Sequence, residues 1–399
     1  MGPTYEDAGG EPQNNRHLVD ELRRFATIDD LRRSDFYRAR KTELSRLLDE
    51  PKIYESPEAS PRLRSFLRIV EWNIERGAKL EGIIGILNNH PVLGYADLLL
   101  LNELDSGMVR SGNRNVPLEL GGALSAHAIY VAEYLELTKG VGEELNLPGE
   151  NQSALHGNAI LTRHAFSKVE VAGLPRCEDN FASREKRLGG RKGILVEIDV
   201  NGTGLLAANA HLDVVNSPRC RGRQLRALLE AIERRAKENP ARPIIVGGDF
   251  NTHTFARGGR LRTLKNTGII LGSNRERLVR RLSRPESREP ALRHLAGFGY
   301  SIEEFNDRLS TARTMVSSLE DSNRLPGPVR WWANRRIGPG GLLLEFRLDW
   351  LAARGLRPLA DGEVVDEQTG VASIAPRTFQ GFALSDHDPI VVDVWSSGQ

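Results

Sequence analysis

From residue 67 onward, the apolar residues of the chain alternate between short unbroken runs and stretches with helical spacing. Residues 67–73 predict a strand that ends in the polar pair Trp72-Asn73. Residues 80–89 have the spacing of an amphipathic helix. Four consecutive leucines then lead into Asn102-Glu103, a short run typical of a strand buried on both faces.

The rest of the chain continues this alternation. Strands are predicted at 158–162, 168–172, 193–200, 205–210, 244–246, 348–351 and 390–394, and a helix at 219–239. Asn201-Gly202 is a hairpin turn signal. Because hairpins occur among the interleaved helices, a single doubly wound sheet fits less well than two mixed sheets packed face to face with helices outside.

Two segments precede this α/β (α+β) body. Residues 1–15 are rich in Gly, Pro, Asn and acid, which predicts a disordered tail. Residues 16–66 form an N-terminal extension, in which apolar residues at helix-like intervals predict a pair of short helices closed by Pro51. The extension could be a substrate lid, a dimer contact or a docked appendage. The body is expected to span 67–399.

A long connection interrupts the body at about 256–345 and exceeds the usual length of a loop. Between residues 257 and 347 there are 18 Lys or Arg against 9 Asp or Glu, a local net charge of +9. The segment also carries Trp331-Trp332 and Leu342-Leu343-Leu344. We expect a helical insertion whose basic groups face an anionic substrate or water.

Composition narrows the class of protein but not its partner. Hydrophobic content of 39%, charged content of 27% and a net charge of +2 fit a soluble globular protein. Cys177 and Cys220 are too few for a disulfide framework, so reduced thiols in a cytoplasmic protein are expected. Neither a signal peptide nor a membrane-spanning run is evident.

The strongest chemical signal is a pair of motifs at strand ends. Gly247-Gly248-Asp249-Phe250-Asn251 follows an apolar strand, and Ser385-Asp386-His387-Asp388-Pro389 precedes one. Strand ends are rigid mounts that can aim carboxylates and an imidazole at one point. Asp249 could take a proton from water while Asn251 orients that water, and this combination suits metal-assisted attack on a phosphate ester.

Four other strand-end residues extend the set. Asn73 could bind a phosphate oxygen, Glu103 could hold Mg²⁺, and His211 could donate to a phosphoryl oxygen. Asp349 could support the imidazole of His387. Each also has an ordinary structural interpretation: a turn-forming Asn, a surface Glu, a His satisfied by Asp213, and an Asp paired with Arg347.

Taken in order, these motifs resemble the endonuclease/exonuclease/phosphatase family. The resemblance rests on Trp72-Asn73, Glu103, Gly157-Asn158-Ala159-Ile160-Leu161, His211, Gly248-Asp249-Phe250-Asn251, Asp349 and Ser385-Asp386-His387-Asp388-Pro389. It covers about 67–394 without the insertion, and it implies a four-layer α/β/β/α sandwich. The chain departs from the family pattern in Asn102, where Gln often precedes the metal-binding Glu, and in the long insertion.

The resemblance also implies a role for each matched residue. Glu103 would hold Mg²⁺ (or Mn²⁺ in its place), with Asn73 and Asp386 as secondary ligands. Asp249 would activate the attacking water and Asn251 would position it. His387 with Asp349, and His211 from another side, would stabilise the transition state. Asn158 would support the site, and Arg191 or Lys192 would contact phosphate.

These roles predict a magnesium-dependent phosphoesterase. A phosphodiester is the expected substrate and nucleic acid is favoured, because basic and aromatic residues of the insertion could bind a strand. A phospholipid or a sugar phosphate is the alternative substrate. For a phospholipid, Trp331-Trp332 and Leu342-Leu343-Leu344 would be the membrane contact. A catalytically silent binding protein of the same fold is a further alternative. The oligomeric state stays open.

Overall fold

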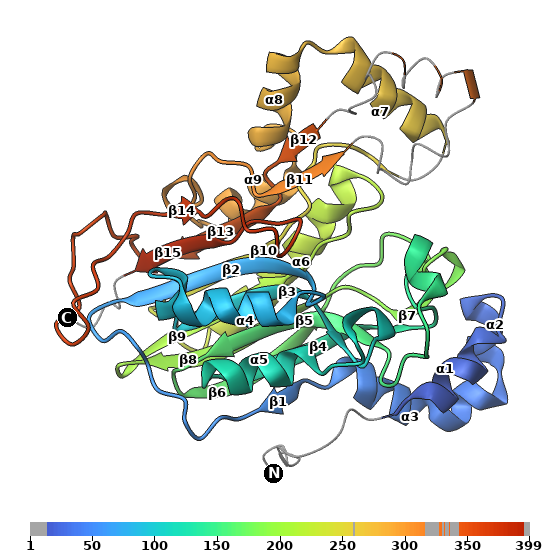
Figure 1. Ribbon diagram of the computed structural model, residues 1–399, viewed down its shortest axis with the longest axis horizontal. Coiled ribbons are helices and arrows are strands. Elements are labelled where there is room, and N and C mark those ends of the chain that lie inside the picture. Colours follow the sequence, from blue (N-terminus) through green and yellow to red (C-terminus); the bar gives the residue numbers. More distant parts are fainter. Residues whose placement is uncertain are drawn as a thin grey trace.

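A computed structural model of the chain describes residues 14–257, 260–315, 327, 328, 331, 335 and 343–394. In these residues two mixed β-sheets pack face to face, with helices on both outer faces (Figure 1). This confirms the predicted α/β sandwich. No helix among the described residues combines the length and apolarity needed to cross a bilayer.

The first sheet holds the parallel pair β2–β3 at its centre. Within the described residues its strand order is β1-β4-β5-β3-β2-β15-β14, and β7 pairs with β4. The strands are β1 (Lys52–Tyr54), β2 (Leu67–Arg76), β3 (Leu98–Ser106), β4 (His127–Glu136), β5 (Leu155–Thr162), β7 (Arg187–Gly189), β14 (Arg377–Thr378) and β15 (Ile390–Val394). Among these strands the short β1, β7 and β14 were not predicted, and neither was the long, almost continuously buried β4.

The second sheet has the order β13-β10-β9-β8-β6, and β9 and β10 are its parallel pair. Its strands are β6 (Phe166–Gly173), β8 (Lys192–Val200), β9 (Thr203–Ala210), β10 (Ile244–Asp249) and β13 (Asp349–Arg354). The predicted hairpin joins β8 to β9, where Asn201 and Gly202 both have positive φ, at 53° and 83°. Two consecutive residues in this conformation match the twist of the flanking strands.

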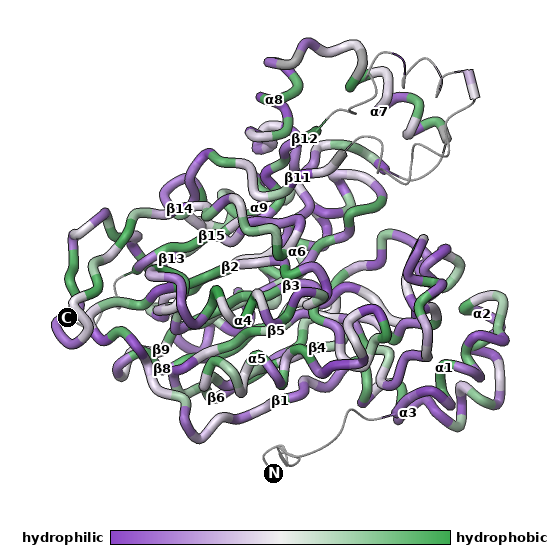
Figure 2. Tube along the Cα trace, in the orientation of Figure 1, coloured by the Kyte–Doolittle hydropathy of each residue, from purple (hydrophilic) through white to green (hydrophobic). Residues whose placement is uncertain are grey.

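Three apolar layers hold the sandwich together. Alternate residues of both sheets meet in the middle, as Ile69, Leu100 and Ile245 do. Outside the first sheet lie α4 (Leu80–Asn89) and α5 (Val116–Leu124), and outside the second lie α6 (Pro218–Ala236) and α9 (Pro290–Gly297). Figure 2 shows the corresponding hydrophobic stretches running along the central strands. The helix predicted at 80–89 is confirmed with the same bounds.

The N-terminal extension forms three helices rather than the predicted pair: α1 (Arg16–Arg23), α2 (Ile28–Arg33) and α3 (Asp35–Asp49). Two caps cause the extra break, because the hydroxyl of Thr27 accepts from Asp30 N and that of Ser34 from Tyr37 N, each at 3.1 Å. Most of the predicted disordered tail, residues 1–13, lies outside the described residues. Asn15 is buried and donates to Ser153 O at 2.8 Å.

The long insertion connects β10 to β13, which are adjacent antiparallel strands. Its described part contains helices, as expected, but also a two-stranded sheet. Its elements are α7 (Arg260–Gly272), α8 (Arg275–Ser283), α9, a 3₁₀ turn at Glu303–Phe305, β11 (Ala312–Met315) and β12 (Leu343–Phe346). Elsewhere in the described residues, short 3₁₀ turns occur at Leu93–Tyr95, Val109–Ser111, Gly142–Asn146 and Asn180–Ala182. α7 and α8 extend beyond the sandwich at the top of Figure 1. Trp332 and Leu342 lie outside the described residues.

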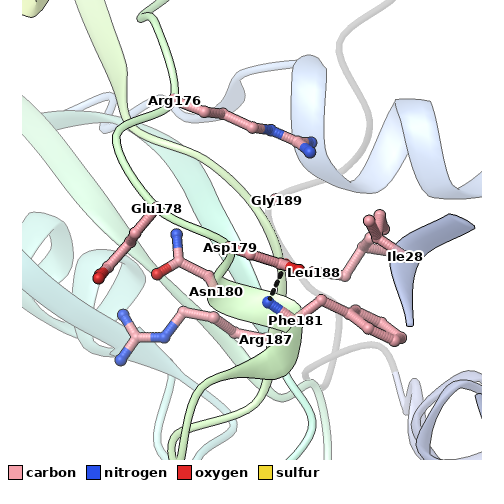
Figure 3. Close-up of a pocket in the computed structure, with 9 residues that line it drawn as sticks. All are labelled: Ile28, Arg176, Glu178, Asp179, Asn180, Phe181, Arg187, Leu188 and Gly189. Carbon is pink, nitrogen blue, oxygen red and sulfur yellow. Dashed lines mark hydrogen bonds between the residues drawn. The ribbon is translucent and has the colours of Figure 1, made fainter. Parts of the chain in front are cut away.

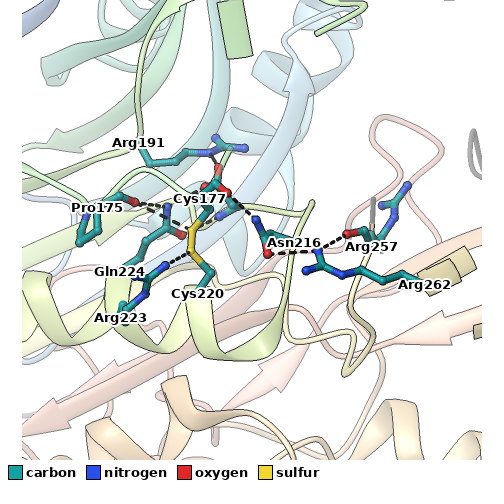
Figure 4. Close-up of a disulfide and its surroundings, with 10 residues drawn as sticks. Pro175, Cys177, Arg191, Asn216, Cys220, Arg223, Gln224, Arg257 and Arg262 are labelled. Atoms are coloured by element: carbon teal, nitrogen blue, oxygen red, sulfur yellow. Dashed lines mark hydrogen bonds and ion pairs between the residues drawn. A yellow bond between two sulfur atoms is a disulfide. The ribbon is translucent and has the colours of Figure 1, made fainter. Parts of the chain in front are cut away.

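The expectation of two reduced thiols is wrong in this structure, because Cys177 and Cys220 form a disulfide (Figure 4). It links the segment between β6 and β7 to the first turn of α6. The Asn216 amide, in the segment that follows His211, also donates to Cys177 O. The number of cysteines could not show that these two distant segments meet. The predicted cytoplasmic location stays a prediction.

Candidate active site

The site lies where the carboxyl ends of the two parallel strand pairs meet across the sandwich. β2 and β3 deliver one group of polar side chains, and β9 and β10 deliver the other. The segments that lead into β13 and β15 complete it. The residues brought together are Asn73, Glu103, His211, Asp249, Asn251, Asp349 and His387.

Asp249 is the centre of this arrangement and is only 2% exposed. Its Oδ2 accepts from Asn73 Nδ2 at 3.1 Å and lies 3.3 Å from His211 Nε2, while its Oδ1 accepts from Asn251 N at 2.9 Å. Burial, together with the negative charge of Asp349, raises the pKa of Asp249 to about 7. A carboxylate with this pKa can exchange a proton near neutral pH.

His387 faces Asp249 and is held from behind by Asp349. Its Nδ1 lies 2.8 and 3.0 Å from the two carboxylate oxygens of Asp349, and its Nε2 lies 3.8 Å from Asp249 Oδ2. Burial alone would lower the pKa of His387, but the carboxylates of Asp349, Asp249 and Asp386 raise it well above its usual value. The arrangement therefore favours a positively charged imidazole directed at the centre of the site.

His211 directly follows β9 and approaches Asp249 from the second sheet. The Asn251 amide nitrogen lies 3.0 Å from His211 Nε2 and 2.9 Å from Leu212 O. Burial first, and the nearby positive charge of Arg191 second, lower the pKa of His211 well below its usual value. The two histidines therefore have opposite charge preferences within one site.

A pair of asparagines, Asn102 and Asn209, joins the two sheets directly beneath the site. Asn102 Nδ2 donates to Asn209 Oδ1 at 3.1 Å, and Asn102 Oδ1 accepts from Asp249 N at 2.8 Å. Asn209 in turn donates to the carbonyls of Leu101 and Ala159, both at 2.9 Å. Sequence reasoning missed this role, although a polar residue near the end of each apolar strand was visible.

Oxygen ligands for a cation gather on the Glu103 side. Burial would raise the pKa of Glu103, but the charges of His211, His156 and Arg76 keep it well below its usual value, so the carboxylate stays ionised. No hydrogen bond or ion pair of this carboxylate occurs among the described residues. Asp386 is exposed. The negative charges of Asp386 and Glu103 both raise the pKa of Glu75, so the three carboxylates are neighbours. An all-oxygen donor set of this kind fits a hard divalent cation.

Two carboxyl groups in β2 were missed by sequence reasoning. Glu75, two residues after Asn73, has a pKa raised by burial and by Asp386. Glu71 is fully buried, and neither of its oxygens has a hydrogen-bond partner among the described residues. Burial and the charges of Asp349 and Asp249 raise the pKa of Glu71 well above its usual value.

Asp249, Asp349 and His387 form a second arrangement that could hold a metal ion, since one ligand atom from each lies within 4.8 Å of the others. However, both oxygens of Asp349 already contact His387 Nδ1. A carboxylate that orients an imidazole, as Asp349 does for His387, suits acid–base chemistry better than metal binding. Glu103 and Asp386 remain the more open position for an ion.

The remaining predicted residues lie at the wall of the site. Asn158 Oδ1 accepts from Glu103 N at 3.4 Å. Arg191 is buried and paired, with Glu133 at 2.7 Å and with Asp213 at 3.2 Å. Lys192 turns away, because its Nζ donates to Leu48 O and Ala132 O. Of the two basic candidates, only Arg191 therefore faces the His211 side.

Left-handed backbone conformations occur on the segments that form the site, as they also do at turns elsewhere in the described residues. Glu75, Arg76, Glu103, Asn251 and Thr254 all have φ between 46° and 66°, in the left-handed region that side chains other than glycine rarely adopt. Such conformations persist where surrounding contacts fix them, and they are frequent at functional sites. The strain marks the same strand ends as the polar side chains do.

A separate small pocket lies between α2 and the 176–189 segment (Figure 3). Ile28 and Phe181 supply apolar walls, while Arg176 and Arg187 supply charge. Arg187 pairs with Glu136 and lies over the ring of Tyr134. None of the predicted site residues lines this pocket, which belongs to the contact between the N-terminal extension and the body.

The two-sheet sandwich thus carries a buried acid–imidazole centre where its parallel strands end. The model of the Endonuclease/Exonuclease/phosphatase family matches residues 70–387. This is most of the chain, so the protein belongs to that family, and phosphoesterase chemistry is the activity class that membership supports. No curated protein matches the sequence significantly.

Several solved structures are similar at low sequence identity. Truncated Caenorhabditis elegans TDP2 is 15% identical, with a TM-score of 0.42, and the match covers 83% of this chain and 98% of that one. The human Nocturnin catalytic domain is 13% identical, with a TM-score of 0.44 and coverages of 86% and 96%. A family protein from Leptotrichia buccalis is 12% identical, with a TM-score of 0.46 and coverages of 83% and 100%.

Proposed function

We propose that this protein is a magnesium-dependent phosphoesterase that cleaves a phosphodiester by in-line attack of an activated water. The observation that carries the proposal is the position of Asp249. It lies between Asn73, His211 and His387, in contact with the backbone of Asn251. A proton acceptor and two imidazoles therefore surround one point.

In this mechanism Asp249 accepts the proton of the attacking water. Its pKa of about 7 makes it a sufficiently strong base while a useful fraction stays ionised at neutral pH. Asn73 and Asn251 fix the carboxylate from two sides and orient the water. The buried position excludes bulk solvent, which strengthens each of these contacts.

His387 then stabilises the charge that develops on the phosphoryl oxygens. Asp349 keeps its ring oriented and positively charged, so that Nε2 is the donor facing the centre. His211 contacts the same phosphate from the β9 side. Glu103 and Asp386, with Asn73, would hold the Mg²⁺ (or Mn²⁺), which as a Lewis acid supplies charge neutralisation at the phosphate.

The test is hydrolysis of bis(p-nitrophenyl) phosphate by the purified protein with and without Mg²⁺, followed by a panel of nucleic acids, phospholipids and sugar phosphates. Turnover by wild type and its loss in Asp249→Asn are expected. Glu233→Gln, at a remote ion pair with Arg354, is a matched control. The absence of metal-dependent turnover across the whole panel would disprove the proposal.

Nucleic acid is the favoured substrate because the insertion presents positive charge. Arg262, Lys265, Arg277 and Arg280 are exposed on α7 and α8. Exposed Lys and Arg bind a phosphate backbone with strong salt dependence. Lys265→Glu/Arg277→Glu should weaken binding of DNA or RNA at low salt. Arg226→Glu/Lys237→Glu, on the outer helix α6 and at the residue that caps its end, should not.

A phospholipid is the second candidate, supported by Trp331 and Leu261, which are 62% and 83% exposed. Exposed aromatic and aliphatic side chains can enter the boundary of a bilayer. Co-sedimentation with anionic liposomes, lost in Leu261→Ser, would favour this candidate over nucleic acid. A catalytically silent binding protein is the remaining alternative, and Mg²⁺ binding without any turnover would support it.

A further inference from the structure

A histidine with no role in the mechanism above lies on the wall of the site. His156 is in β5, two residues before Asn158, so strand alternation places both side chains on the same face. Asn158 contacts the backbone of Glu103 from that face. His156 is therefore directed toward the Glu103 side of the space between the sheets, and it is 5% exposed.

One side of the His156 ring is fixed by a buried acid. Asp105 is its cross-strand partner in β3, and Asp105 Oδ1 lies 2.8 Å from His156 Nδ1. Arg110 holds the same carboxylate with two hydrogen bonds of 2.8 and 3.0 Å, and Ser111 Oγ donates to it at 3.2 Å. The orientation of the imidazole is thus set by a fully engaged carboxylate.

The other side of the ring is open. His156 Nε2 makes no hydrogen bond with any described residue, in contrast to Nδ1. The ring is also close enough to both Glu103 and His211 to influence their pKa values, lowering each of them. These two residues border the phosphate position from the first and the second sheet.

We infer that His156 is a substrate-binding residue whose Nε2 donates a hydrogen bond to a phosphate oxygen on the Glu103 side. Asp105 fixes the ring through Nδ1 and leaves Nε2 as the atom that meets the phosphate. The inference rests on the proposed phosphoesterase function. It adds a third imidazole, held by its own acid, to the pair formed by His211 and His387.

The experiment compares His156→Asn with wild type. Asparagine keeps a polar group near the Nδ1 position but removes Nε2, whereas His156→Gln keeps a group near Nε2. The kcat and KM for bis(p-nitrophenyl) phosphate and the dissociation constant of inorganic phosphate are measured with Mg²⁺. His127→Asn is the matched control, because His127 lies at the far end of β4 and accepts from Ser56 N.

We expect His156→Asn to lower kcat/KM and to weaken phosphate binding by roughly 10- to 100-fold, the loss typical of one hydrogen bond to a charged group. His156→Gln should lose less, and His127→Asn should match wild type. If wild type turns over while His156→Asn stays within about twofold of it in both measurements, the inference is wrong. Inactivity of wild type on every substrate overturns the proposed function instead.

A measurement on the unaltered protein covers the case in which the variants do not fold. Of the 9 histidines in the chain, His156 should show a shift of its Nε2 nitrogen resonance when inorganic phosphate is added to ¹⁵N-histidine-labelled protein. His127 should show none. An unchanged His156 resonance at saturating phosphate would overturn the inference, whatever the activity of the protein.

Discussion

Asp249 and Asp349 are cross-strand partners: they lie directly opposite each other at the end of the antiparallel pair β10–β13. Like charges in this position repel. This repulsion helps to raise the pKa of Asp249. The Asp349 carboxylate also contacts His387 Nδ1 and so orients the imidazole. One residue thus adjusts both the base and the imidazole of the proposed reaction.

Asp349→Asn should therefore shift both limbs of the pH profile of kcat/KM to lower pH. The acid limb follows ionisation of Asp249, whose pKa falls when the facing negative charge is removed. The alkaline limb follows loss of the proton of His387, whose raised pKa falls for the same reason. The maximum should drop on the order of 10²-fold. A profile of unchanged midpoints would contradict this coupling.

Asp249→Asn should lower kcat by about 10²- to 10⁴-fold, the contribution typical of a general base. Binding of inorganic phosphate should persist or strengthen, since a buried negative charge is removed. Single-turnover kinetics and phosphate calorimetry measure the two quantities separately. Loss of both together would indicate a folding defect rather than the loss of a base, and circular dichroism would reveal it.

Glu103→Gln should weaken Mg²⁺ binding at least tenfold, because even residues that only support a metal ligand typically contribute that much. Glu233→Gln, remote from the site, should bind Mg²⁺ as wild type does. Isothermal titration calorimetry gives the comparison. Equal affinities in wild type and Glu103→Gln would place the ion elsewhere, and the Asp249–Asp349–His387 arrangement would be the next position to examine.

Gly248→Ala should destabilise the protein by more than about 2 kcal/mol. Gly248 has φ of 138°, and an added Cβ would lie 2.0 Å from the carbonyl oxygen of Ala210. Gly202→Ala is the matched control, since Gly202 has φ of 83° but open space around it. Urea denaturation should show a clearly larger loss for Gly248→Ala, and equal losses would argue against the clash.

Reduction of the Cys177–Cys220 disulfide should lower the free energy of unfolding by about 4 kcal/mol, the chain-entropy value for its sequence separation of 43. Cys177→Ser/Cys220→Ser should show the same stability as reduced wild type. Urea denaturation with and without reductant tests both statements. A wild-type midpoint that is insensitive to reductant would mean that the bond does not form in solution.

Sequence reasoning predicted which strand-end side chains lie together better than it predicted their surroundings. Asp249, His387 and Glu103 follow or precede apolar runs, and such short-range patterns survive folding. Long-range pairing left no such signal: the Asn102–Asn209 contact joins two sheets, and Cys177 meets Cys220 only through the placement of α6. Glu71 was missed because a buried carboxyl group cannot be told from an exposed one in the polar half of an alternating strand.

The β10–β13 connection leaves and re-enters the sheet at two residues that face each other, Asp249 and Asp349. A segment attached at these two residues, whatever its length, leaves the register of β10 and β13 unchanged. Asp249 and Asp349 therefore keep their positions. Replacement of the segment by another would therefore change what is presented at the rim and leave the reacting centre as it is. Exchange of the β10–β13 connection alone would thus give the same sandwich a different substrate preference.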